Sequence, residues 1–163
     1  MTYLSKAILV AAAMGLAACS SAGRFDDASS ASSIAGTVQD PSSPLYFQQA
    51  VGDRVLFAVD QSTLTREAAA ILDGQAQWLM SNGDYSVVIE GHADEQGTRE
   101  YNLALGARRA NAVREFLLGK GVAGSRLRVV SYGKERPIEI CSEESCYAKN
   151  RRAVTVISAG ATS

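Results

Sequence analysis

Asp94 and Arg109 are the residues of this chain whose types and spacing best suit a ligand that carries both charges. They belong to the polar stretch GHADEQGTREYNLALGARRANAV, residues 91–113. An arginine fork binds a carboxylate through two parallel hydrogen bonds, and an aspartate attracts an ammonium group. Asp94 follows a predicted strand, and Arg109 lies about three turns into the next predicted helix, which can fold back beside the loop. This spacing leaves two interpretations open, a ligand site or an internal Asp94–Arg109 salt bridge.

The same stretch contains side chains that could bind a metal or perform catalysis. His92 and Asp94 share a face of an extended segment, but the chain has a single histidine and offers no third ligand beside them. Glu90 with Asp94 or Glu95 could form a glycosidase acid–base pair, but these carboxylates fall close together at one strand end instead of across a cleft. No Ser/His/Asp or Cys/His set is present either. The sequence therefore predicts no enzyme, no catalytic residue, no metal and no cofactor.

The elements that position these residues follow from hydrophobic periodicity. Apolar, β-branched runs predict strands, and apolar residues at helical spacing predict helices. Strands are expected at 53–60, 85–91, 126–133 and 153–158, and helices at 65–80, 99–118 and, as a short element, 147–153. Alternating strands and helices favour an α/β fold with two layers, a mixed sheet of about four strands with helices on one face.

Capping residues and apolar faces define the two long helices. Thr65 and Thr98 are placed to cap their starts, and Glu67 lies in a positive first turn. Gly119 and Gly121 are expected to stop the second helix. The buried faces are predicted to contain Ala68, Ile71, Leu72, Ala76 and Leu79 in the first helix, and Leu103, Ala110, Val113 and Leu117 in the second.

The start of the chain is typical of an exported protein. Residues 1–18 hold one basic residue and an apolar run too short to span a membrane, which needs about 20 residues, so they predict a signal peptide. The run ends in LAAC, which resembles the bacterial lipobox and makes Cys19 the expected lipid-modified residue; an ordinary signal with a chance cysteine is the alternative. Ser20 follows where many inner-membrane lipoproteins have aspartate, which implies delivery to the outer membrane. The net charge of −1 implies no nucleic-acid partner.

Residues 19–44, rich in serine, alanine and glycine, predict a flexible tether with an extended reach of about 85 Å. Residues 45–163 are expected to form one folded domain. If Cys19 carries lipid, Cys141 and Cys146 are left to pair, and a disulfide between them suits an oxidising compartment. Metal binding by the pair is the alternative, but only Glu143 and Glu144 lie nearby as further ligands.

Three segments carry a family resemblance over roughly residues 53–157. VVIEGHADEQGTREYNLALGARRANAVREFLLGKGV, VSYGKERP and KNRRAVTV resemble the OmpA-like family, whose lipid-anchored members bind the cell wall. Val59 departs from the aromatic-Phe-x-Phe-Asp pattern of the family's first strand, although Phe57 and Asp60 fit it. Arg99 stands where relatives often have proline at the helix start.

The resemblance implies peptidoglycan as the ligand. Diaminopimelate in the wall's stem peptide has a free end with an ammonium and a carboxylate on one carbon. Asp94 and Arg109 are the expected partners of these two groups. Phe57, Leu105 and Asn102 complete the candidate site. One residue among Asn150, Arg151 and Arg152 is expected to support Asp94 from behind.

The resemblance also implies the setting of the protein. It predicts a lipid-anchored protein of the outer membrane, facing the periplasm, that tethers this membrane to the wall. The Tol machinery, which draws the outer membrane inward at cell division, is the expected partner system, through its periplasmic propeller protein. The alternative is an adaptor whose main ligand is that Tol protein.

Overall fold

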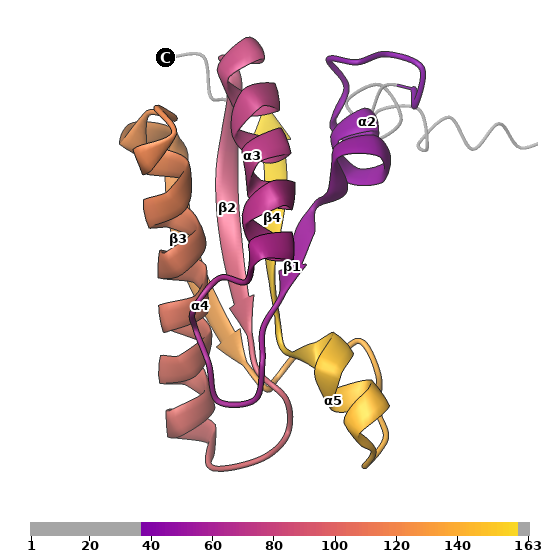
Figure 1. Cartoon of the computed structure of the whole chain (residues 1–163), viewed down its shortest axis with the longest axis vertical. Coiled ribbons are helices and arrows are strands. Elements are labelled where there is room, and N and C mark those ends of the chain that lie inside the picture. The colour runs from indigo at the N-terminus through magenta and orange to yellow at the C-terminus, as the bar shows by residue number, and fades with distance from the viewer. Residues whose placement is uncertain (1–36, 160–163) are drawn as a thin grey trace, which may run out of the picture.

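The computed structural model describes residues 37–159 of the chain. The predicted signal peptide, Cys19 and most of the predicted tether lie outside the described residues. The elements in chain order are α2 (Pro44–Tyr46), the π-helical turn η1 (Phe47–Gly52), β1 (Arg54–Leu56), α3 (Arg66–Ser81), β2 (Tyr85–His92), α4 (Arg99–Gly119), the short 3-10 turn η2 (Gly124–Arg126), β3 (Leu127–Gly133), α5 (Glu144–Asn150) and β4 (Arg152–Ala159) (Figure 1).

The strands form one mixed sheet in the order β1-β4-β2-β3. Strand β4 pairs antiparallel with both β1 and β2, whereas β2 and β3 run parallel. The parallel pair requires a crossover, which α4 provides. The predicted four-stranded α/β architecture is confirmed.

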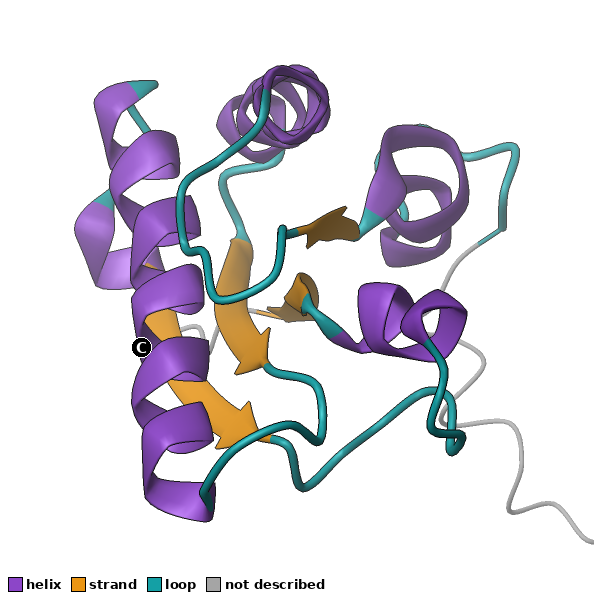
Figure 2. Ribbon diagram, turned by 60° about the horizontal axis from the view of Figure 1, so that its bottom comes forward, coloured by secondary structure: helices purple, strands orange, loops and turns teal. Residues whose placement is uncertain are grey.

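Helices α3 and α4 cover one face of the sheet, and α4 runs along β3 in both views (Figures 1 and 2). Alternation along β2 turns Val87 and Ile89 toward the helices, and both are fully buried. They pack with the apolar stripes of the two helices in a single core. No helix within residues 37–159 has the length and apolar character needed to cross a bilayer.

Both long helices begin where their caps predict. Thr65 accepts a hydrogen bond from the Ala68 backbone amide, and Thr98 accepts one from Tyr101. Most of the predicted apolar positions are buried, but Ile71 is 36% and Leu103 41% exposed, so these two assignments are wrong. Both residues are at the edge of their helix's apolar stripe, where helical spacing alone cannot separate core from surface.

Helix α4 approaches β2 closely because both contribute a glycine at their contact. A Cβ atom on Gly91 would lie 1.8 Å from the carbonyl oxygen of Gly106, and one on Gly106 would lie 2.4 Å from Ser131 Oγ. Neither position can therefore hold a side chain without moving the helix. Gly91 was expected to end its strand, but β2 continues to His92. The close contact sets the distance at which Arg109, in the following turn of α4, meets the end of β2.

Three element boundaries differ from the sequence expectation. Helix α5 covers Glu144–Asn150 instead of 147–153, because β4 already starts at Arg152. Strand β1 is only Arg54–Leu56 long. At the other end, the Trp78 indole N–H donates to the Pro41 carbonyl at 2.7 Å, so packing against the domain starts before residue 45.

Candidate functional site

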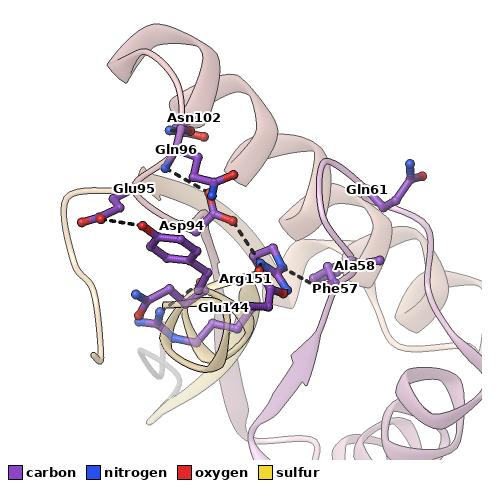
Figure 3. Close-up of polar contacts among 12 residues, drawn as sticks. Phe57, Ala58, Gln61, Asp94, Glu95, Gln96, Asn102, Glu144 and Arg151 are labelled. Atoms are coloured by element: carbon purple, nitrogen blue, oxygen red, sulfur yellow. Dashed lines mark hydrogen bonds and ion pairs between the residues drawn. The ribbon is translucent and has the colours of Figure 1, made fainter. Parts of the chain in front are cut away.

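The loop between β2 and α4 presents Asp94 at the end of the sheet opposite the start of the described chain (Figure 1). Asp94 is 7% exposed, and its Oδ1 accepts a hydrogen bond from the Gln96 backbone amide at 3.2 Å. Asn102 in α4 is buried and donates to the Gln96 carbonyl at 2.7 Å. Helix α4 therefore fixes the loop that holds Asp94 (Figure 3).

Arg151 is the cation paired with Asp94. It lies between α5 and β4, and its Nη1 is 3.2 Å from Asp94 Oδ2. Its Nε donates to the Phe57 carbonyl at 3.2 Å, and the guanidinium also pairs with Glu144 (Figure 3). Burial alone would lower the pKa of Arg151, but the hydrogen bonds to Glu144 and Asp94 raise it. Among the three candidates from the sequence, Arg151 is the one that contacts Asp94.

The other two candidates have different roles. Asn150 accepts hydrogen bonds from the backbone amides of Ile138 and Glu139, at 2.8 and 3.2 Å, and holds that loop. Arg152 donates to the carbonyls of Asn150 and Arg136. Both side chains therefore make contacts within the domain and none with Asp94 among the described residues.

Arg109 is fully buried between the end of β2 and the loop after β1. Its guanidinium donates to three backbone carbonyls, those of Gln61 and His92 at 2.8 Å and of Ala58 at 3.2 Å. It also stands 5.3 Å from the centroid of the Phe57 ring. Burial lowers its pKa to about 10, although the charge of Asp94 acts in the opposite direction. Arg109 thus joins the loop after β1 to the end of β2, and the ion pair of Asp94 within the described residues is made by Arg151 instead.

A cavity of about 280 Å³ opens beside Asp94. Asp94, Asn102 and Leu105, three of the five predicted binding residues, line it; Phe57 and Arg109 are not among its lining residues. The remaining lining residues are Val59, Asp60, Gln96, Gly97 and Tyr101. Two carboxylates on its wall favour a cationic ligand group. A larger hollow of about 620 Å³ lies between the N-terminal segment and α3, but no charged side chain lines it.

Asp60 and Tyr101 were not predicted for this site. Asp60 has φ +57°, the one positive φ outside glycine among residues 37–159. Its carboxylate accepts a hydrogen bond from the Tyr101 hydroxyl. The FxxD pattern of the first strand was the available signal for Asp60, whereas the contact with Tyr101 depends on how α4 is placed.

His92 is buried, with the Tyr132 ring and Glu90 as neighbours. Neither ring nitrogen has a hydrogen-bond partner within the described structure. Burial, followed by the charges of Arg152 and Arg136, lowers its pKa to about 4. Glu90 Oε2, 3.6 Å from Nε2, would favour a charged ring, but desolvation and the two arginines outweigh this contact. His92 contributes to the site through its carbonyl, which accepts from Arg109.

Helix α5 and the turn before it contact the outer side of the loop. Cys141 and Cys146 form a disulfide with their Cα atoms 6.0 Å apart. The Tyr147 hydroxyl donates to Glu95 at 3.0 Å, and the Ser142 hydroxyl does so at 3.4 Å. The sequence predicted the cysteine pair but not these contacts.

Residues 56–151 match the model of the OmpA family. The chain belongs to the OmpA family. The resemblance predicted from its motifs is therefore confirmed. Family membership also agrees with the expectation of a protein that is not an enzyme.

Several relatives are similar to this chain over most of their length. A peptidoglycan-associated lipoprotein of Rhizobium meliloti is 47% identical over 144 residues, which cover 88% of this chain and 82% of the relative. One of Mesorhizobium japonicum is 48% identical over 151 residues, covering 93% and 90%. The crystal structure of the peptidoglycan-associated lipoprotein from Burkholderia pseudomallei superposes with a TM-score of 0.66 at 40% identity, covering 74% of this chain and 98% of that one.

Proposed function

We propose that this protein is an outer-membrane lipoprotein that binds peptidoglycan non-covalently, through the free end of diaminopimelate. The observation that carries the proposal is the position of Asp94 on the wall of a charged cavity, with the Arg109 guanidinium buried between the end of β2 and the loop after β1. Relatives with high identity are named for association with peptidoglycan, which supports this choice of ligand.

In this proposal the two charges of diaminopimelate have separate partners. Its ammonium binds Asp94, in a cavity where Asp60 adds a second negative charge. Its carboxylate binds Arg109, whose side chain has five N–H donors. Three carbonyls already accept from this guanidinium, and donors remain for a carboxylate. Because Arg109 is 0% exposed, the loop after β1 must shift to admit the ligand. Of the three hydrogen bonds from Arg109 to backbone carbonyls, the one to Ala58 is the longest, and we expect it to break first.

The arrangement of the domain suits a tether between membrane and wall. The described chain begins at residue 37, at one end of the sheet, whereas the Asp94 loop and α5 lie at the other end (Figure 1). A lipid on Cys19 would hold the first end toward the outer membrane, so that the cavity would face the wall. The same proposal includes binding to the periplasmic propeller protein of the Tol machinery, which acts at cell division. This part follows from the family resemblance.

Binding to purified wall sacculi tests this function. The delipidated mature protein is incubated with sacculi that contain diaminopimelate, and with matched sacculi whose stem peptides carry lysine at that position. Lysine lacks the second carboxylate, so we expect retention by the first sacculi only, and release by free diaminopimelate. Equal retention by both kinds of sacculi would contradict the proposed ligand.

The adaptor alternative makes a different prediction in the same assay. If the Tol propeller protein is the main ligand, the protein binds it directly but is not retained by sacculi. Under the proposed function sacculi retain the protein, and the propeller protein competes with them.

A further inference from the structure

The segment 141–147 reaches the proposed wall-binding loop at several points. Tyr147 and Ser142 both donate to Glu95, the neighbour of Asp94. Glu144 pairs with the guanidinium of Arg151, which also holds Asp94. The segment thus contacts the side chains of Glu95 and Arg151, the two residues next to Asp94 in sequence and in its ion pair (Figure 3).

The helix that presents these side chains is weak in isolation. Helix α5 has seven residues, and Glu143 at its N-cap makes no side-chain capping bond. Isolated helices shorter than about 12 residues are marginal in water. The disulfide joins Cys141, in the turn before α5, to Cys146 within it, and so closes the first turn covalently. The bond therefore maintains the helical turn that places Glu144.

Glu144 and Asp94 share one cation. Arg151 Nη1 lies 3.2 Å from Asp94 Oδ2 and 3.4 Å from Glu144 Oε2, and Nη2 also pairs with Glu144. The hydrogen bond from Arg151 lowers the pKa of Glu144, which favours the ionised carboxylate. If Glu144 no longer pairs with Arg151, Asp94 is the remaining carboxylate that pairs with this arginine within the described residues. A ligand ammonium then meets a carboxylate that is already neutralised.

We propose that the Cys141–Cys146 disulfide and Glu144 are positioning elements of the wall-binding site, which keep Asp94 available to a cationic ligand by holding part of the charge of Arg151. The inference rests on the proposed function, because it names what tunes that site. Neither element touches the ligand, and both act through Arg151.

A double-mutant cycle on binding to diaminopimelate-containing sacculi tests this inference. The variants are C141S/C146S, Glu144→Gln, and the combination of the two. We expect the disulfide variant and Glu144→Gln each to bind about three- to tenfold more weakly, as modest coupling between contacting groups allows. Because both changes act through Arg151, their effects should not add. The combined variant should bind sacculi as well as whichever of C141S/C146S and Glu144→Gln has the lower affinity.

Controls separate positioning from loss of folding. Melting curves must show each variant folded at the assay temperature. Lys149→Gln, in the same helix, removes only the ion pair with Glu139 and should bind like the wild type. Wild-type binding by C141S/C146S, or losses that multiply in the combined variant, would overturn the inference. Two free thiols in protein purified from the periplasm, detected by alkylation and intact mass, would also overturn it. Absence of wild-type binding would instead refute the proposed function.

Discussion

Arg151 Nη1 lies 3.2 Å from Asp94 Oδ2, so the acidic residue of the candidate site has a cationic partner before any ligand binds. Both side chains are buried. Arg109, whose spacing had left an internal ion pair with Asp94 open as the alternative, is instead held by three backbone carbonyls. Under the proposed function, a ligand ammonium would have to compete with Arg151 for Asp94.

Arg151→Met should be strongly destabilising. It breaks the buried ion pair with Asp94 and removes the hydrogen bond to the Phe57 carbonyl, and breaking a buried ion pair commonly costs about 3–5 kcal/mol. Urea denaturation measures the loss as a lower free energy of unfolding. Arg128→Met is the matched control, because Arg128 is exposed on the open face of the sheet and its loss should change stability by less than about 0.5 kcal/mol. Similar stabilities for the two variants would be inconsistent with this role of Arg151.

Gly106→Ala tests the close contact between α4 and β2. Its Cβ would lie 2.4 Å from Ser131 Oγ and 2.8 Å from the Gly91 carbonyl oxygen, so the helix must move away. We expect a loss of about 1–3 kcal/mol, as for other overpacked sites. Gly119→Ala, in the same helix but with no atom within 4 Å of the new Cβ, should be neutral or slightly stabilising. A neutral Gly106→Ala would contradict a close contact between α4 and β2.

His92 should make stability depend on pH below neutrality. Its pKa falls from 6.5 to about 4 on folding, so the unfolded chain binds more protons between these values. Stability is complete above about pH 6.5 and decreases as the pH drops toward 4, with about 2 kcal/mol lost between pH 7 and 5. His92→Gln should flatten this part of the curve, measured by urea denaturation at each pH. Parallel curves for the two proteins would refute the assignment to His92.

Cys19→Ala tests the predicted anchor. Without a cysteine at the end of the LAAC motif no lipid can be attached, and the protein should move from the outer-membrane fraction to the soluble periplasmic fraction. Immunoblots of fractionated cells measure the distribution. Retention of the variant in the outer membrane at the wild-type level would exclude Cys19 as the anchor.

Local signals predicted the fold better than the site. The caps at Thr65 and Thr98 depend on residues three positions away, and both were predicted correctly. The residue that supports Asp94 could be narrowed only to Asn150, Arg151 or Arg152, because Arg151 reaches Asp94 through the pairing of β4 with β2. Arg109 was placed beside the loop by helical spacing, but its three carbonyl acceptors depend on the path of the loop after β1. Distant contacts of this kind have no periodicity in the sequence.

The central claim is that Asp94 and Arg109 bind the charged end of diaminopimelate. The most direct test is the equilibrium affinity for diaminopimelate-containing sacculi of Asp94→Ala and Arg109→Lys, with folding verified by melting curves. Loss of one partner of a charge pair commonly costs about 2–5 kcal/mol, and lysine cannot reproduce the arginine fork. We therefore predict that each variant stays folded but binds sacculi more than about tenfold more weakly than the wild type. Folded variants that bind sacculi like the wild type would contradict the account and place the wall-binding site elsewhere.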